Sequence, residues 1–287
     1  MAEFGFHSTA EDVTEGLDLS GQTWLITGVN SGLGYETARV LSLRGARIVG
    51  AARSLEKAQG ALDALGAAGT PVACELSDLG SVRAAVAAID EDLDGIIANA
   101  GIMALPTLQQ VHGIERQLFT NHIGHFTLVT GLLGKLKPAG RVVILSSGAH
   151  RMANERGMEL DNLSGEVDYH PWRMYGRSKL ANVLFARALS KRLSEGQTAN
   201  SLHPGVIPTN LARHVPDPEG LMAQMKRLKS VGQGAATQCY VATRPELAGV
   251  TATYFSDCAP ADTIAAGADD ALAEELWART EAIVAGL

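Results

Sequence analysis

Short apolar runs alternate with amphipathic stretches along the chain, after a polar arm at residues 1–20. Short apolar runs bounded by turn residues are typical of buried strands, and apolar positions three and four apart are typical of helices. The predicted strands are Thr23–Thr27, Arg47–Ala52, Val72–Leu76, Gly95–Asn99, Val142–Ser146 and one that begins over Thr198–Leu202. The predicted helices are Gly34–Leu43, Leu55–Leu65, Ser81–Ile89, Ile114–Leu133 and Tyr175–Leu193. This order predicts a doubly wound, Rossmann-type α/β sheet of about seven parallel strands, in a single domain over residues 21–287.

Two segments interrupt this alternation. Residues 149–174 are loop-like, and residues 204–228 contain four prolines before a helical stretch. Both follow predicted strands, and open α/β sheets bind their ligands at the carboxyl ends of the strands. We therefore predict that 149–174 and 204–228 form the walls and lid of a substrate pocket. The alternative is that they are ordinary surface loops.

Composition and charge narrow the class of protein. The net charge of −7 disfavours binding to phosphate backbones and anionic membranes, so no nucleic-acid partner is expected. Three cysteines without a CxxC pair indicate neither a disulfide framework nor a zinc knuckle, and favour a reducing compartment. The polar start of the chain contains no apolar signal region, and no stretch is typical of a membrane span. We expect a soluble, cytoplasmic protein without a membrane anchor.

The turn after the first predicted strand is rich in glycine. Glycine permits a tight turn and a close approach of the backbone to a pyrophosphate, and the helix that follows offers free N–H groups. Glycine is frequent in this chain, with 31 residues, so the prediction depends on the position of the turn between a strand and a helix. The residues expected to bind the cofactor here are Gly28, Asn30, Ser31, Gly32, Leu33 and Gly34.

The end of the second predicted strand indicates the type of cofactor. An acidic residue there would bind the ribose hydroxyls of NAD(H) and repel the 2′-phosphate of NADP(H). The strand ends instead in Ala51-Ala52-Arg53-Ser54, and the Arg53 guanidinium can pair with a phosphate. The sequence therefore favours NADP(H) over NAD(H). The alternative for Arg53 is a solvated surface side chain.

Tyr175 and Lys179 lie one helical turn apart. A tyrosine hydroxyl titrates near 10, about three units too high for a base at neutral pH, and lowering its pKa that far needs roughly 4 kcal/mol. A nearby ammonium can supply much of this stabilisation. Taken alone, the pair is also typical of a helix surface, so the prediction depends on what accompanies it.

Other polar motifs occur near the ends of the remaining predicted strands. They are Asn99-Ala100-Gly101, Asn121 in the intervening helix, Ser146-Ser147 and His203-Pro204-Gly205. The order TGxxxGxG, NAG, N, SS, YxxxK and PG resembles the short-chain dehydrogenase/reductase family over nearly the whole chain. The segments NHIGHF, SKLANV and HPGV resemble its retinol-dehydrogenase-like branch.

The resemblance implies roles for these residues. Tyr175 is expected to be the general acid/base, with Lys179 lowering its pKa and binding the nicotinamide ribose. Ser147, rather than Ser146, is expected to orient the substrate oxygen, and Asn121 to anchor a proton-relay water. The further cofactor-binding residues that the resemblance implies are Glu75, Leu76, Asn99, Ala100, Gly101, Pro204, Gly205, Val206 and Thr209.

The implied activity is the NADP(H)-dependent interconversion of an alcohol with an aldehyde or ketone, on a hydrophobic small molecule. Two alternatives stay open: the same reaction with NAD(H), and a catalytically silent dinucleotide-binding sensor. No metal site is expected, because His122 and His125 have no further ligands grouped with them. A homodimer, a homotetramer and a monomer are all compatible with the sequence.

The chain departs from the family pattern at two places. Glu75 stands where the family usually has aspartate beside the adenine, which puts that contact in doubt. The 28-residue spacing from Ser147 to Tyr175 is longer than is common in the family, which reinforces 149–174 as a specificity loop.

Overall fold

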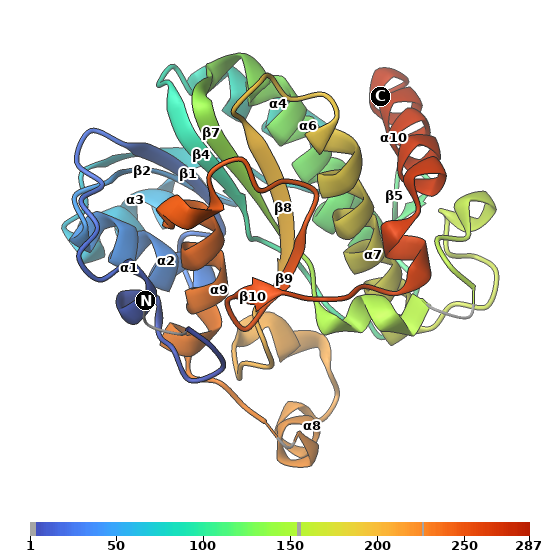
Figure 1. Ribbon diagram of the computed structural model, residues 1–287. Coiled ribbons are helices and arrows are strands. Elements are labelled where there is room, and N and C mark those ends of the chain that lie inside the picture. Colours follow the sequence, from blue (N-terminus) through green and yellow to red (C-terminus); the bar gives the residue numbers. More distant parts are fainter. Residues whose placement is uncertain (1–3, 154–155, 226) are drawn as a thin grey trace.

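A computed structural model describes residues 4–153, 156–225 and 227–287 (Figure 1). A central eight-stranded sheet has the order β10-β9-β8-β7-β4-β1-β2-β3. The seven strands from β9 to β3 pair in parallel, and β10 pairs antiparallel with β9. The predicted parallel sheet is therefore confirmed, with one short antiparallel strand added at its edge. The strands are β1 (Thr23–Thr27), β2 (Arg47–Ala52), β3 (Gly69–Ala73), β4 (Leu93–Ala98), β7 (Leu136–Leu145), β8 (Thr198–His203), β9 (Tyr254–Ser256) and β10 (Ala259–Pro260).

Helices cover both faces of the sheet, which explains why the strands read as continuous apolar runs (Figure 1). One face carries α2, α3 and α9, and the other carries α4, α6, α7 and α10. The helices are α2 (Gly32–Leu43), α3 (Leu55–Leu65), α4 (Leu79–Ala88), α6 (Gly124–Leu132), α7 (Pro171–Ser190), α9 (Val231–Thr243) and α10 (Asp270–Ala285).

Several elements differ from their predicted bounds; β7, for example, begins six residues earlier than predicted, and three other differences have a clear physical reason. β3 lies three residues earlier than predicted, because Gly69–Ala73 is the segment that pairs with β2, while buried Cys74 and Leu76 follow the strand. The helix predicted over 114–133 is broken into β6 (Ile114–Glu115), α5 (Arg116–Leu118), a π-helical turn η1 (Phe119–Ile123) and α6. α7 begins at Pro171 rather than Tyr175, because proline suits the first turn of a helix. The first turn of α7 therefore belongs to the helix and not to the predicted loop 149–174.

The N-terminal arm lies against the domain. Its short helix α1 (Ala10–Thr14) packs on α2 and α9, with Val13 fully buried. The ring of Phe4 meets that of Tyr240 edge to face, with 5.9 Å between centroids. The arm thus covers apolar side chains of the two helices on that face.

The segment after β8 is only partly irregular. It contains a 3₁₀ turn, η5 (Asn210–His214), and the short helix α8 (Pro218–Gln224), which projects from the lower edge of the molecule (Figure 1). This edge holds the carboxyl ends of the parallel strands, and the strand order reverses between β1 and β4. A ligand site is expected at this point of an open α/β sheet. In the part of the chain that the structure describes, no helix is both long and apolar enough to cross a membrane.

Candidate active site

A cavity of about 480 Å³ opens at the carboxyl ends of the strands. It brings together almost all of the predicted site residues, although they come from segments throughout the chain. Gly34 and Asn121 do not line it. The predicted residues that do are Gly28, Asn30, Ser31, Gly32, Leu33, Arg53, Glu75, Leu76, Asn99, Ala100, Gly101, Ser147, Tyr175, Lys179, Pro204, Gly205, Val206 and Thr209.

The glycine-rich turn has the geometry that a bound phosphate needs. Gly28 has φ +70°, and a Cβ there would lie 3.1 Å from Nδ2 of Asn99. A Cβ on Gly34 would collide with the carbonyl oxygen of Gly28, so Gly34 allows close packing behind the cavity. Ser31, the N-cap of α2, forms no side-chain cap bond, which leaves the first N–H groups of the helix free for a ligand. These features fit the pyrophosphate of a dinucleotide.

A hydrogen-bond network fixes the turn against the end of β4. The Thr27 hydroxyl accepts from the backbone N–H of Asn99 at 2.9 Å and of Ala100 at 3.0 Å, and Asn99 Nδ2 donates to the Thr27 carbonyl at 2.7 Å. His125, which the sequence left without a role, hydrogen-bonds with the same hydroxyl at 2.9 Å. The network orders the floor of the cavity.

His122 and His125 have partners within the protein. His122 hydrogen-bonds with Thr280 at 3.0 Å, and His125 with the Asn121 carbonyl at 3.0 Å. Burial lowers the pKa of His122 to about 3 and that of His125 to about 4, so both rings are neutral. Among the described residues, no group of three His, Cys, Asp or Glu side chains could hold a metal ion.

Tyr175 and Lys179 are both buried on α7 and both face the cavity. Lys179 Nζ lies 5.7 Å from the centre of the Tyr175 ring and donates to the Leu145 carbonyl at 3.1 Å. Burial lowers the pKa of Lys179 to about 8 and raises that of Tyr175 to about 12, and a hydrogen bond with Ser147 opposes the second shift. At neutral pH the tyrosine is therefore a phenol and the lysine an ammonium.

The two adjacent serines have different surroundings. The Ser146 hydroxyl donates to the Lys179 carbonyl at 2.7 Å and is almost fully buried. The Ser147 hydroxyl meets the hydroxyl of Tyr175 and accepts from the Ala149 N–H at 3.1 Å. This geometry favours Ser147 as the serine that reaches a substrate oxygen.

Asn121 lies behind the cavity in the π-helical turn η1. Its side-chain oxygen accepts from the Ile102 N–H at 2.9 Å, and its Nδ2 donates to the Ile102 carbonyl and the Ser178 hydroxyl, each at 2.9 Å. π-Helical turns occur often at functional sites, because they displace one residue from the helical register. Here the turn ties the segment after β4 to α7 between Tyr175 and Lys179.

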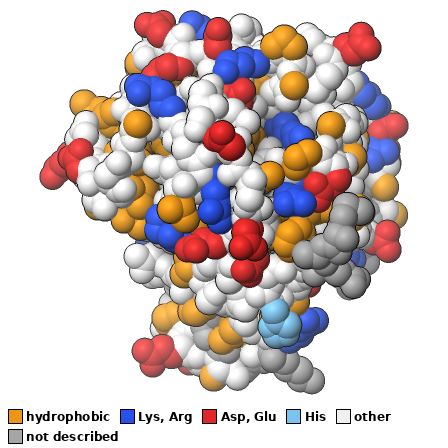
Figure 2. Space-filling view, turned by 60° about the vertical axis from the view of Figure 1, so that its left-hand side comes forward, with side chains coloured by type: hydrophobic (Ala, Val, Ile, Leu, Met, Phe, Trp, Pro, Cys, Tyr) orange, Lys and Arg blue, Asp and Glu red, His pale blue; other side chains and the backbone are white. Residues whose placement is uncertain are grey.

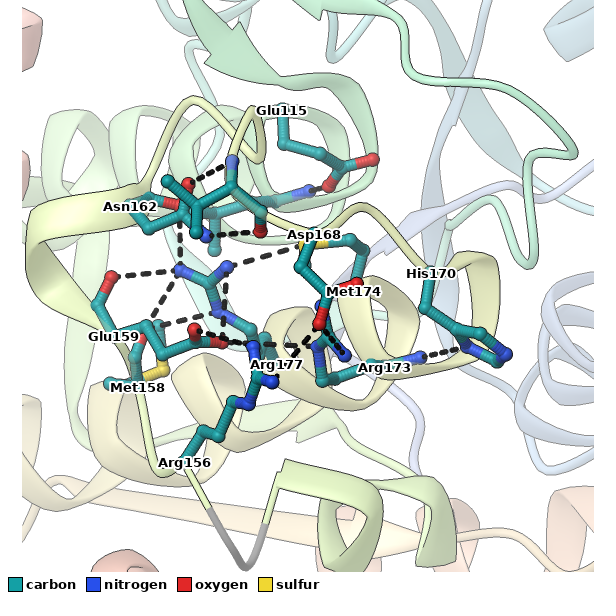
Figure 3. A network of polar contacts seen from close by, with 12 residues as sticks. Glu115, Arg156, Met158, Glu159, Asn162, Asp168, His170, Arg173, Met174 and Arg177 are labelled. Atoms are coloured by element: carbon teal, nitrogen blue, oxygen red, sulfur yellow. Dashed lines mark hydrogen bonds and ion pairs between the residues drawn. The ribbon is translucent and has the colours of Figure 1, made fainter.

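The loop 149–174 is fastened to α7 through Arg177 (Figure 3). This arginine is 2% exposed, and its guanidinium donates to the carbonyls of Met158, Glu159 and Asn162 at 2.9–3.1 Å. The Glu159 carboxylate lies 3.6 Å from its Nη1. One side chain within the YxxxK segment thus fastens residues 158–162, which lie in the chain between the cavity-lining Met152 and Trp172, to α7.

Replacing Arg177 by methionine is expected to lower the free energy of unfolding by about 3 kcal/mol. The change leaves three carbonyls, two of them fully buried, without their arginine donor, and it removes the nearest of the three cations around Glu159. Denaturant titration followed by circular dichroism measures the loss. Arg173→Met is the control: Arg173 pairs with the exposed Asp168 at 3.2 Å and lies 4.0 Å from Glu159 but bonds none of these carbonyls, so its loss should cost less than about 1 kcal/mol. Equal losses in the two variants would contradict this assignment.

A buried ion pair supports the turn after β8. Gly205 has φ +100°, and a Cβ there would lie 2.6 Å from Cδ of Lys229. The fully buried Lys229 side chain reaches Asp257 at 2.6 Å, and its backbone N–H donates to the Val206 carbonyl at 2.9 Å. Only glycine therefore fits this position of the Pro-Gly motif, and Lys229 sets how close the turn lies to the cavity.

The lining of the cavity combines positive charge with apolar side chains. Three arginines and one lysine line it against a single glutamate, Glu75, whose carboxylate accepts from Ser77. The face shown in Figure 2 has acidic and basic side chains interspersed, in contrast to the excess of cations along the cavity. At the Tyr175 end the walls are apolar, with Met103 and Ala212 packed against the tyrosine and Trp172 beside it.

Comparison with known proteins identifies the family. A family model described as short chain dehydrogenase matches residues 22–159. The chain is 41% identical to short-chain dehydrogenase TIC 32 B, chloroplastic, of Brassica napus, over 96% of this chain and 92% of that protein. It is 36% identical to retinol dehydrogenase 14 of Homo sapiens, over 93% of this chain and 87% of that protein. A solved structure of an uncharacterized protein from Mycobacterium paratuberculosis is 30% identical, with TM-score 0.77 over 95% of this chain and 96% of that chain.

The chain therefore belongs to the short-chain dehydrogenase family of oxidoreductases, which bind a nicotinamide dinucleotide. Its resemblance to the retinol-dehydrogenase-like branch is confirmed. The sequence had not singled out Arg116 and Arg213, which also line the cavity, or Arg177 and Lys229, which support it. Arg177 lies inside the recognised YxxxK segment, Arg213 lies within the predicted segment 204–228, and Lys229 directly follows that segment, whereas no motif pointed to Arg116.

Proposed function

We propose that the protein is an NADP(H)-dependent oxidoreductase that interconverts a hydrophobic alcohol and its aldehyde or ketone. The observation that carries the proposal is the cavity itself, where a net positive, phosphate-fitting end adjoins an apolar end at Tyr175. A nicotinamide dinucleotide has the matching polarity, with phosphates on one half and the reactive ring on the other. Arg53 favours the 2′-phosphorylated form, because no carboxylate stands at the end of β2 to repel it.

The site residues support a defined proton chemistry. The cofactor, when bound, supplies or accepts the hydride. The high pKa of Tyr175, about 12, keeps its hydroxyl protonated at neutral pH, so it can donate a proton to the oxygen of a carbonyl as that oxygen gains charge. Ser147 meets the same hydroxyl and can orient the carbonyl oxygen beside it. A protonated Tyr175 is the form that carbonyl reduction requires, and alcohol oxidation would start from the deprotonated form.

The apolar end of the cavity supports a hydrophobic substrate. Met103, Trp172 and Leu211 line it together with Ala149 and Ala212. Small-molecule pockets gain affinity mainly by burying apolar surface, with a few polar groups fixing the orientation. The polar groups here are the hydroxyls of Tyr175 and Ser147, which suits a carbonyl on an otherwise apolar molecule.

Location is a further part of this proposal. The three cysteines are buried free thiols, which supports work in a reducing compartment such as the cytoplasm.

The test is a fluorescence titration with NADPH and NADH, followed by NADPH oxidation rates over a panel of aldehydes and ketones. Tighter NADPH binding with turnover of apolar carbonyls is the expected result. Tight binding with no turnover on the panel would favour the dinucleotide sensor instead. Absence of binding to either cofactor would overturn the proposal.

Arg53→Ala is expected to weaken NADPH binding by about thirty-fold and NADH binding by less than about threefold. The estimate is the loss of one charge-assisted contact, worth about 2 kcal/mol. The Kd of each cofactor is measured by the same titration. Equal weakening of both cofactors, or of neither, would remove Arg53 from the phosphate site.

A further inference from the structure

Two further arginines line the same cavity as Arg53: Arg116, which donates to the Gln109 side chain at 2.8 Å, and Arg213. Arg53 follows β2, whereas Arg213 belongs to the turn η5 in the segment after β8, and both line the cavity. They are 160 positions apart in the sequence, and only the fold brings them to one site. Arg213 was not expected to take part from the sequence, which indicated the segment 204–228 but none of its cations.

The surroundings of Arg53 and Arg213 leave their charges available to a ligand. Among the residues described, neither guanidinium has a carboxylate within 4.0 Å, although many other arginines of this acidic chain do. The single side-chain hydrogen bond found for Arg213 is to the Asn210 carbonyl at 3.0 Å, within its own turn. Partial burial and the neighbouring charge of Arg53 lower the pKa of Arg213. Two like charges that line one cavity repel each other, and a bound anion would offset that repulsion.

The turn that carries Arg213 is held in place beside the catalytic tyrosine. The preceding residue, Ala212, is 5% exposed and packs with Met103 and Tyr175. Thr209 caps the turn, with its hydroxyl accepting from the Leu211 N–H. One short segment therefore packs on Tyr175 through Ala212 and adds the cation of Arg213 to the lining of the same cavity.

We propose that Arg213 is a second determinant of cofactor specificity, which holds the 2′-phosphate of NADP(H) together with Arg53. The inference rests on the proposed function and deepens it. The glycine turn and the free N–H groups at the start of α2 are available to bind the pyrophosphate. The 2′-phosphate is a dianion, and the single positive charge of one guanidinium neutralises only part of its charge. Because Arg213 and Ala212 are adjacent, occupation of this phosphate subsite also fixes the wall beside Tyr175.

The test compares two nucleotides that differ by one phosphate. Adenosine 2′,5′-bisphosphate and adenosine 5′-monophosphate are titrated into the wild type, Arg53→Met, Arg213→Met and the double variant. We expect Arg213→Met to raise the Kd of the bisphosphate about tenfold and that of the monophosphate less than twofold. We also expect the loss in the double variant to fall short of the product of the single losses, because both side chains bind one group.

Two controls make the outcome decisive. Arg83→Met removes the same charge from α4, outside the cavity, where the side chain donates to the Val284 carbonyl, and it should leave both Kd values unchanged. Arg213→Lys should restore part of the lost affinity, since it keeps the charge without the planar fork. Equal loss of both nucleotides in Arg213→Met, or no loss, would overturn the inference while leaving Arg53 and the proposed function intact. A wild type that binds both nucleotides equally would overturn the NADP(H) preference as well.

Discussion

Tyr175→Phe is expected to reduce kcat for carbonyl reduction by about 10³-fold or more and to leave the Kd of NADPH within about twofold. The substitution removes one oxygen from a residue that is 4% exposed, so the ring keeps its packing against Met103 and Ala212. What is lost is the proton donor. The phenol, with its pKa raised to about 12 by burial, is protonated across the working range of pH, and phenylalanine has no proton to give.

The chain offers a matched control for this experiment. Tyr169 is half-buried, and burial raises its pKa to about 12 as well, but its hydroxyl donates to the Leu105 carbonyl at 2.7 Å, and the residue does not line the cavity. Tyr169→Phe should therefore keep kcat within about threefold, at the cost of one hydrogen bond. Single-turnover rates with saturating NADPH separate the chemical step from binding. Equal turnover in Tyr175→Phe and the wild type would exclude Tyr175 as the acid.

The sequence predicted the parts of the site that depend on local pattern. β1, β2 and α3 were predicted at their observed bounds, because a buried strand and an amphipathic helix each have their own period. The glycine turn was predicted in the same way, because the strand pattern before it and the helix pattern after it define its position between β1 and α2. Parallel strands place their carboxyl ends at the same edge of the sheet, so predicting the strands also predicted that the motifs after them lie together.

What the sequence did not predict depends on contacts between distant segments. Asn121 was placed in a regular helix, and nothing in its neighbours indicates the π-helical turn that directs its side chain to Ile102 and Ser178. Arg177 lies inside the recognised YxxxK segment, yet its partners are carbonyls 15–19 residues away in an irregular loop. Every residue has a backbone carbonyl, so the residue types do not indicate which carbonyls Arg177 binds. Only the folded structure shows these partners.

The structure also refines the expected relation between Tyr175 and Lys179. The resemblance implied that the ammonium lowers the pKa of the phenol, but here burial raises that pKa, and the opposing effect comes from the hydrogen bond with Ser147. Lys179 is itself shifted by burial, to a pKa of about 8. The lysine is thus the group of this pair whose protonation changes near physiological pH.

NADPH binding is therefore expected to weaken as the pH rises through about 8. The folded-state pKa of Lys179 is depressed from 10.5, so its ammonium is present below about pH 8 and is lost above it. The ammonium donates hydrogen bonds to the ribose hydroxyls and attracts the anionic cofactor. The neutral amine is a weaker donor and has no charge to attract the cofactor. Titrations with NADPH from about pH 6 to about pH 10 measure the effect, in a range where the arginines stay charged.

Lys179→Met should abolish this pH dependence and lower kcat/KM by roughly 10³-fold, the equivalent of two charge-assisted hydrogen bonds at about 2 kcal/mol each. Lys179→Arg, which stays charged at every pH tested, should flatten the profile while retaining more of the affinity. A change in kcat/KM without a change in the pH profile would show that another group titrates near pH 8. His203 also lines the cavity, but burial lowers its pKa to about 4, so it is neutral throughout this range and cannot replace Lys179 as the source of the effect.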